Sequence, residues 1–103
     1  MKLLLSDRII LNFTDLLPKK GKFEEMVAVE DIAKKVKLTQ EDFKKYNIRT
    51  NENGAIVCDS TEEEFDYEFT ELELAAIKKA LKNAEEKGEL FRDYLHLYRL
   101  FNA

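Results

Sequence analysis

The hydrophobic positions in the N-terminal half of the chain recur with the period of an α-helix in two segments. The first covers residues 7–17, with Ser6 as the expected N-cap and Pro18 as the expected stop, because proline disfavours helical backbone at the preceding residue. The second covers residues 24–36 and has an acidic first turn and a basic last turn. Phe23, which lies between the two helices, is expected to enter the core.

A short helix and a hairpin are predicted next. Thr39 followed by acidic residues is typical of a helix start, so a third helix is expected over residues 40–46. The turn Asn51–Gly54 separates two β-prone runs, residues 48–50 and 55–58, and its Asn-Gly pair supplies the positive φ angles of a tight turn. These residues therefore predict a short β-hairpin.

Residues 64–69 alternate strictly between acidic and aromatic side chains. On an extended strand this alternation separates the two kinds of side chain onto opposite faces. The expected solvent face is Glu64, Asp66 and Glu68, and the expected inner face is Phe65, Tyr67 and Phe69. The pattern thus predicts a half-buried edge strand with an acidic outer face.

The last third of the chain predicts two helices. Thr70 and Glu73 form a complete capping box, which is the most clearly marked helix start in the sequence. This helix is expected to end near Lys87, with Gly88 as its C-cap. A final helix over residues 90–101 carries more apolar side chains than one buried face requires, which indicates a surface for a second copy or another protein.

Together these elements predict a mainly helical α+β fold. Two helices, a short helix and a hairpin, in that order, resemble a winged helix-turn-helix, in which a three-helix core carries a short β-hairpin. We expect a single domain over residues 1–103, made of a core with its hairpin (1–58), an acidic strand or connector (59–70) and a C-terminal helical hairpin (71–103). The alternative is an irregular α+β domain in which the acidic strand completes a three-stranded sheet with the hairpin.

Composition narrows the class of protein further. The chain has 103 residues, of which 45% are hydrophobic and 37% charged, enough for one compact domain. Its apolar runs are too short to cross a bilayer and its first residues lack a secretory signal pattern, so we expect a cytoplasmic protein with no membrane partner. The single cysteine, Cys58, excludes an internal disulfide and a cysteine-rich zinc site, and is expected to be a small buried hydrophobe.

No constellation of residues in the sequence indicates catalysis. Three glycines, one proline and one histidine leave no phosphate-binding loop and no histidine-based metal cluster. Residues 59–68 lack the spacing of an EF-hand loop. His96, on the last helix, is expected to be an ordinary surface or partly buried residue rather than a catalytic base. We therefore expect a protein that is not an enzyme and has no catalytic residue, metal or cofactor.

The net charge of −4 is distributed unevenly along the chain. Residues 1–23 carry +3, residues 24–50 are neutral, residues 51–73 carry −9 and residues 74–103 carry +2. Because DNA phosphates would repel a hairpin region of charge −9, nucleic acid is the less favoured partner. The acidic stretch is either a solvated face or a surface for a basic protein.

Two groups of residues are candidate binding sites. The first combines the acidic stretch with tyrosine and arginine of the last helix, residue types enriched in protein interfaces. Its members are Glu62, Glu63, Glu64, Asp66, Glu68, Tyr94, Tyr98 and Arg99. The alternative is a nucleic-acid patch formed by Lys34, Lys35, Lys37, Lys44 and Lys45.

Ser6-Asp7-Arg8, followed by Leu16-Leu17-Pro18-Lys19 and Gly21-x-Phe23, resembles small uncharacterised proteins of bacteriophages and prophages. In those proteins a Leu-Pro-x-x-Gly-x-Phe element precedes a helix and a C-terminal helix pair closes the chain. The resemblance implies a phage accessory protein in a bacterial host cell, and it carries over no functional residues.

Two functions from different classes follow from these observations. The favoured one is a non-enzymatic phage or prophage accessory protein that acts through protein–protein interaction, by its acidic face or by self-association as a homodimer. The alternative is a winged-helix DNA-binding regulator or packaging factor that uses the second and third helices.

Overall fold

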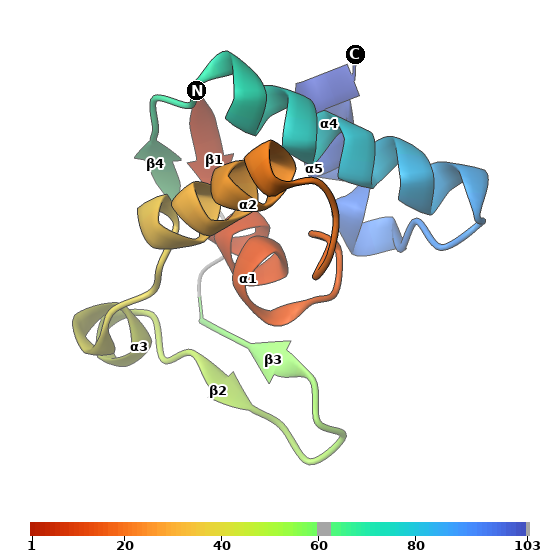
Figure 1. Cartoon of the computed structure of the whole chain (residues 1–103). Helices are drawn as coiled ribbons and strands as arrows, with labels where there is room; N and C mark the ends of the chain where they lie inside the picture. The colour runs from red at the N-terminus through yellow and green to blue at the C-terminus, as the bar shows by residue number, and fades with distance from the viewer. Residues whose placement is uncertain (60–62, 103) are drawn as a thin grey trace.

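The computed structural model describes residues 1–59 and 63–102 and is mainly helical, with two small antiparallel sheets (Figure 1). This confirms the predicted α+β class. In chain order the elements are β1 (Lys2–Leu4), α1 (Leu5–Phe13), α2 (Phe23–Lys35), α3 (Gln40–Lys45), β2 (Arg49–Thr50), β3 (Ile56–Val57), β4 (Glu64–Asp66), α4 (Glu71–Glu86), the 3-10 helix η1 (Arg92–Tyr94) and α5 (Leu95–Asn102). None of the described helices is long and apolar enough to span a membrane.

The main core is formed by α1, α2, α4, α5 and the inner face of β1. Its buried side chains are Leu3, Ile10, Leu11, Ala28, Ile32, Val36, Ala76, Ile77, Leu81, Tyr94 and Leu97. Each fully buried leucine or isoleucine stabilises the fold by about 1.5–3 kcal/mol relative to an exposed one. Helices α2 and α4 pack against each other (Figure 1), and two ion pairs, Lys35 with Glu73 and Glu25 with Lys79, join them.

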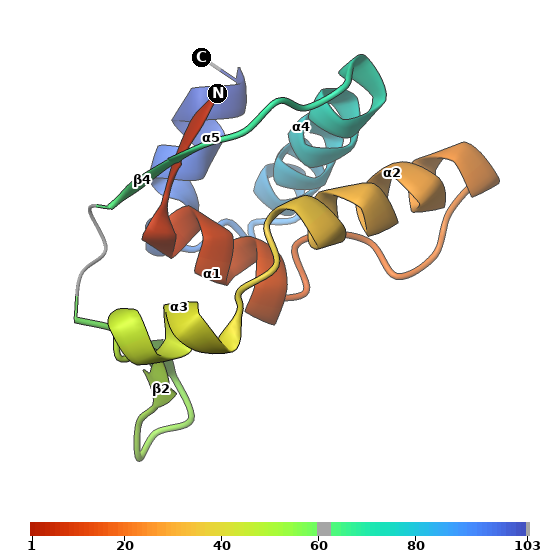
Figure 2. The same cartoon turned by 90° about the vertical axis from the view of Figure 1, so that its left-hand side faces the viewer.

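A smaller second cluster holds α3 and the hairpin. It consists of Leu5, Leu38, Tyr46 and Ile48, and it lies below α1, away from α4 and α5 (Figure 2). The predicted hairpin is confirmed, since Arg49 pairs with Val57 and Thr50 with Ile56. The winged-helix arrangement is not confirmed, because the strongest helix pairing joins α2 to α4 rather than to α1 and α3.

Strand β4 pairs antiparallel with β1 and not with the hairpin. Leu3 lies opposite Phe65, and Lys2 lies opposite Asp66. The alternative of a three-stranded sheet is therefore wrong, because the pairing partner comes from the N-terminus, where the sequence predicted no strand. The alternation is confirmed: the three acidic residues are exposed, and the three aromatic residues are partly buried.

Two predicted helix starts are confirmed by their capping hydrogen bonds. Thr39 accepts from the Asp42 backbone N–H and Thr70 from that of Glu73, and each acidic side chain accepts in return from the cap residue's N–H. These reciprocal bonds satisfy N–H groups that the first turn of a helix leaves without partners. The predicted helix over residues 24–36 is also present, as α2.

The boundaries of the first helix differ from the prediction. Ser6 is not the N-cap: α1 begins at Leu5, and the Asp7 carboxylate accepts from the Leu4 N–H at 2.9 Å. The helix ends at Phe13 and not at residue 17, because the backbone of Thr14 is extended, with φ −110° and ψ 169°.

Three other predictions are corrected. Phe23 does not enter the core and is 82% exposed. It precedes the buried Ala28 by five positions, which places it about 140° away around α2. The final α-helix begins at Leu95 rather than residue 90, after the 3-10 turn. Cys58 is half-buried instead of fully buried.

Candidate functional site

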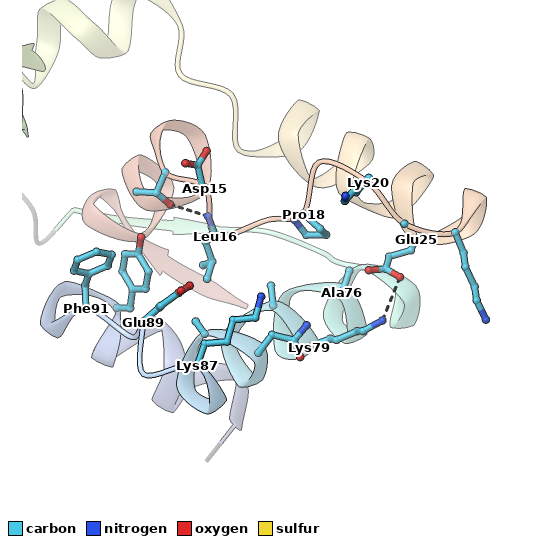
Figure 3. Close-up of a pocket in the computed structure, with 17 residues that line it drawn as sticks. Asp15, Leu16, Pro18, Lys20, Glu25, Ala76, Lys79, Lys87, Glu89 and Phe91 are labelled. Carbon is cyan, nitrogen blue, oxygen red and sulfur yellow. Dashed lines mark hydrogen bonds and ion pairs between the residues drawn. The ribbon is translucent and has the colours of Figure 1, made fainter.

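A groove of about 770 Å³ lies between the loop that follows α1, helix α4 and the turn that follows α4 (Figure 3). We call it the groove. It is lined by Thr14, Asp15, Leu16, Pro18, Lys20, Gly21, Lys22, Glu25, Ala76, Lys79, Ala80, Asn83, Ala84, Lys87, Glu89, Phe91 and Tyr94.

Local backbone chemistry positions the two walls of the groove. Thr14 ends α1 and its hydroxyl also accepts from the Leu16 N–H at 3.3 Å, which turns the chain so that Leu16 packs against the main core. At the other wall, Gly88 adopts φ +68°, a conformation that glycine tolerates best, and this ends α4 and starts the turn to Phe91.

The floor of the groove is apolar and its rim is charged. Alanines of α4 and the Leu16 side chain form the floor, and Phe91, which is 65% exposed, stands at one end. The Phe91 ring meets the buried Tyr94 ring edge to face, with centroids 5.3 Å apart. An apolar centre within a polar rim is the usual composition of a protein-binding surface.

The charges of the rim are only partly paired. Glu25 and Lys79 form an ion pair at 3.3 Å at the end of the groove opposite Phe91 (Figure 3). Asp15 pairs with Lys19 at 3.2 Å. The remaining charged lining residues, which form no ion pair with any residue that the structure describes, are Lys20, Lys22, Lys87 and Glu89.

A smaller hollow of about 220 Å³ adjoins the groove. The two share Lys22, Glu25, Ala76 and Lys79, so the Glu25–Lys79 ion pair lies on the boundary between them. The hollow runs between the N-terminal halves of α2 and α4, and Leu72, at its edge, is 61% exposed. Exposed apolar side chains therefore lie near both ends of one continuous surface.

The acidic residues predicted as a partner site form a separate face on β4. Glu63, Glu64, Asp66 and Glu68 are exposed, while Glu62 lies outside the described residues. The N-terminal ammonium of Met1 pairs with Asp66 at 3.1 Å, and Lys2 approaches Glu64 at 3.9 Å. Part of this acidic charge is thus neutralised within the chain.

The predicted interface residues of the last helix lie in different environments. Tyr94 is buried in the main core and also lines the groove. Tyr98 is partly buried and its hydroxyl donates to Glu85, and this hydrogen bond raises the pKa of the Tyr98 hydroxyl. Arg99 is exposed.

The five lysines of the alternative patch are exposed, but two of them are engaged. Lys34 pairs with Glu30 at 3.2 Å, and Lys35 pairs with the buried Glu73 and also donates to the Glu68 carbonyl. Lys37, Lys44 and Lys45 form no ion pair with the described residues. Three of the five lysines are therefore not held in ion pairs with described residues, and the acidic first turn of α3 lies close to them in the chain.

Lys35 and Glu73 join α2 to α4. The Glu73 side chain is buried, and its carboxylate also accepts from the Thr70 N–H at 2.7 Å. Burial alone raises the pKa of the Glu73 carboxyl, but the hydrogen bonds from Lys35 and Thr70 outweigh it, so this pKa lies below its usual value. The pair aligns the two helices that shape the groove.

A buried polar cluster that the sequence did not indicate surrounds Arg8. Its guanidinium is buried, donates to the Lys37 carbonyl at 2.9 Å, and lies 4.3 Å from the centroid of the Phe65 ring. It also pairs with Asp42 at 3.5 Å. Burial raises the pKa of the Asp42 carboxyl. Hydrogen bonds from Thr39 and the nearby positive charge of Arg8 lower this pKa by more than burial raises it, so it lies below its usual value.

Asp7 and His96 form a second cluster that the sequence did not indicate. Asp7 is fully buried, and its Oδ2 lies 2.8 Å from Nδ1 of the exposed His96. Among the described residues, no hydroxyl is bonded to His96, and there is no group of three or more side chains that could hold a metal ion. The pair links α5 to the start of α1.

Comparison of the chain with models of protein families, with curated proteins and with solved structures finds no match.

Proposed function

We propose that this protein is a non-enzymatic accessory protein that acts by binding another protein, and that the groove beside α4 is its binding surface. The observation that carries the proposal is the groove itself, about 770 Å³ in volume, with an apolar floor and a charged rim. Phe91, which is 65% exposed, adds an apolar ring at one end of this floor. Exposed apolar groups beside unpaired charges are typical of surfaces that another protein covers.

The sequence resemblance supports a phage or prophage role for this binding activity, and with it a place in the cytoplasm of a bacterial host. A DNA-binding regulator has less support. Two of its five candidate lysines are held in ion pairs, and α3 opens with Glu41 and Asp42 at the end that would enter a groove of DNA.

The test is selection of a displayed library of random peptides on the immobilised protein. A groove-filling variant, Asn83→Trp, provides the comparison, because Asn83 is exposed on α4 and lines the groove. Its matched control is Lys78→Trp, which introduces the same side chain about 140° around the same helix. Circular dichroism verifies that both variants keep their helical content.

Selected peptides are expected to bind the wild type and Lys78→Trp equally and to lose about tenfold or more in affinity for Asn83→Trp. Peptides that bind all three proteins equally would contradict the groove as the binding surface. If they instead lose affinity for a Glu64→Gln, Asp66→Asn, Glu68→Gln variant, the acidic face is the binding surface.

A further inference from the structure

Building on the proposed function, we infer that the groove recognises an acidic segment of a partner protein that also carries an apolar side chain. The inference concerns the chemistry of the partner and rests on two independent properties of the groove, its unpaired charge and its apolar floor.

The unpaired charge of the groove is positive. Three lysines of the lining have no ion-pair partner in the described part of the chain: Lys20 and Lys22 on one wall and Lys87 on the other. Among the acidic lining residues, Glu89 alone has no ion-pair partner in that part of the chain. Three lysines against one glutamate leave an excess of two positive charges around the floor. A partner segment with two or more carboxylates would neutralise this excess.

The floor requires more than charge from the partner. Leu16, Pro18 and the alanines of α4 line it, and the exposed Phe91 ring closes one end. A polyanion without apolar groups would leave this surface uncovered, whereas a leucine or aromatic side chain beside the carboxylates would bury it. The chemistry that fits both properties is an acidic peptide with an apolar anchor.

The distribution of charge over the molecule favours the same partner. The segment with nine acidic and no basic residues, 51–73, includes β3 and β4, which lie away from the turn that follows α4 (Figure 1). The groove lysines come from the two positively charged segments, 1–23 and 74–103. An acidic partner is therefore repelled by one side of the protein and attracted to the other, which orients the encounter.

The experiment uses the peptides selected on the wild-type protein. A charge-reversal variant, Lys20→Glu, Lys22→Glu, Lys87→Glu, changes the groove. The control, Lys37→Glu, Lys44→Glu, Lys45→Glu, makes the same change in net charge on exposed lysines around α3. Fluorescence anisotropy measures the affinity of each labelled peptide at low and high salt, with a short DNA duplex as competitor.

We expect the selected peptides to be enriched in Asp and Glu together with Leu or an aromatic residue. Their affinity for the groove-reversal variant should be about tenfold or more below their affinity for the wild type, and their affinity for the control should change little. Their affinity for the wild type should also fall when the salt concentration is raised. A selection on the groove reversal should enrich basic peptides instead.

Other results separate this inference from the proposed function. Selected peptides that depend on the groove, by the Asn83→Trp test, but carry no excess of acid would overturn the inference and leave the proposed function standing. Selection that yields no groove-dependent peptide would overturn both. If the DNA duplex competes as effectively as the acidic peptide, the groove binds phosphates and the inference is overturned. If light scattering finds a dimer that the groove reversal dissociates, the groove binds a second copy of the chain, which also overturns the inference.

Discussion

The imidazole Nδ1 of His96 lies 2.8 Å from the carboxylate Oδ2 of Asp7, although 89 positions separate the two residues in the chain. Asp7 is fully buried, and its second oxygen has no hydrogen-bond partner among the described residues. Burial of a carboxylate is costly unless hydrogen bonds and opposite charge compensate it. The contact therefore fastens α5 to the N-terminal end of α1.

Replacing His96 by alanine is expected to lower the free energy of unfolding by about 1–3 kcal/mol, because the buried Asp7 carboxylate loses a partner. Asp7→Asn removes the buried charge, so the double variant should be more stable than the sum of the two single losses by about 1 kcal/mol. Urea denaturation of the four proteins measures this coupling. Strictly additive losses would show that the contact contributes nothing.

The Lys35–Glu73 pair predicts how stability depends on pH. The pKa of Glu73 lies below its usual value of 4.5, so its stabilising contribution is fully present above that value and is lost as the pH falls through the lowered pKa. We expect the free energy of unfolding of the wild type to fall below about pH 4.5 more steeply than that of Glu73→Gln. Parallel curves for the two proteins in urea denaturation across this range would contradict the lowered pKa.

Phe65→Ala tests the inner face of β4. Its ring packs against Tyr46, with centroids 6.0 Å apart, and lies under the Arg8 guanidinium. Because Phe65 is only partly buried, the expected loss is about 2–3 kcal/mol, less than the roughly 3–5 kcal/mol of a fully buried phenylalanine. Phe23→Ala is the matched control, and its 82% exposure predicts a loss below about 0.5 kcal/mol. Equal losses in thermal or urea unfolding would argue against the burial pattern.

Neutralising the outer face of β4 should leave folding nearly unchanged. In the variant Glu64→Gln, Asp66→Asn, Glu68→Gln, the ion pairs to Met1 and Lys2 are lost, but exposed pairs contribute only about 0–1 kcal/mol each and like-charge repulsion is relieved. The free energy of unfolding is therefore expected to change by less than about 1 kcal/mol. A larger loss would mean that the acidic side chains hold β4 against β1.

Features governed by neighbouring residues were predictable from the sequence. The Thr70–Glu73 capping box, the turn at Gly54 and the alternation over residues 64–69 each depend on a few consecutive positions, and the structure confirms all three. The same holds for the helix start at Thr39.

Features that depend on distant pairing were not predictable. The strand β1 exists because Lys2–Leu4 pair with Glu64–Asp66, and the paired residues lie 60 to 64 positions apart in the chain. Helix α1 follows it directly, so Leu4 is the N-cap residue, its N–H donates to the Asp7 carboxylate, and Ser6 falls inside the helix. The groove is likewise formed by two segments, residues 14–25 and 76–94, that lie more than fifty positions apart in the chain, and no local pattern marks it.

The most direct test of the groove as a binding surface is NMR mapping of the bound state. Two-dimensional amide spectra of the labelled protein, recorded during titration with a selected acidic peptide, report which residues the peptide contacts. The largest shift changes are predicted in residues 14–22 and in residues 76–91, around Lys20 and Lys87. Changes confined to β4, or to α3 and the hairpin, with the groove residues unaffected, would contradict the proposed binding surface.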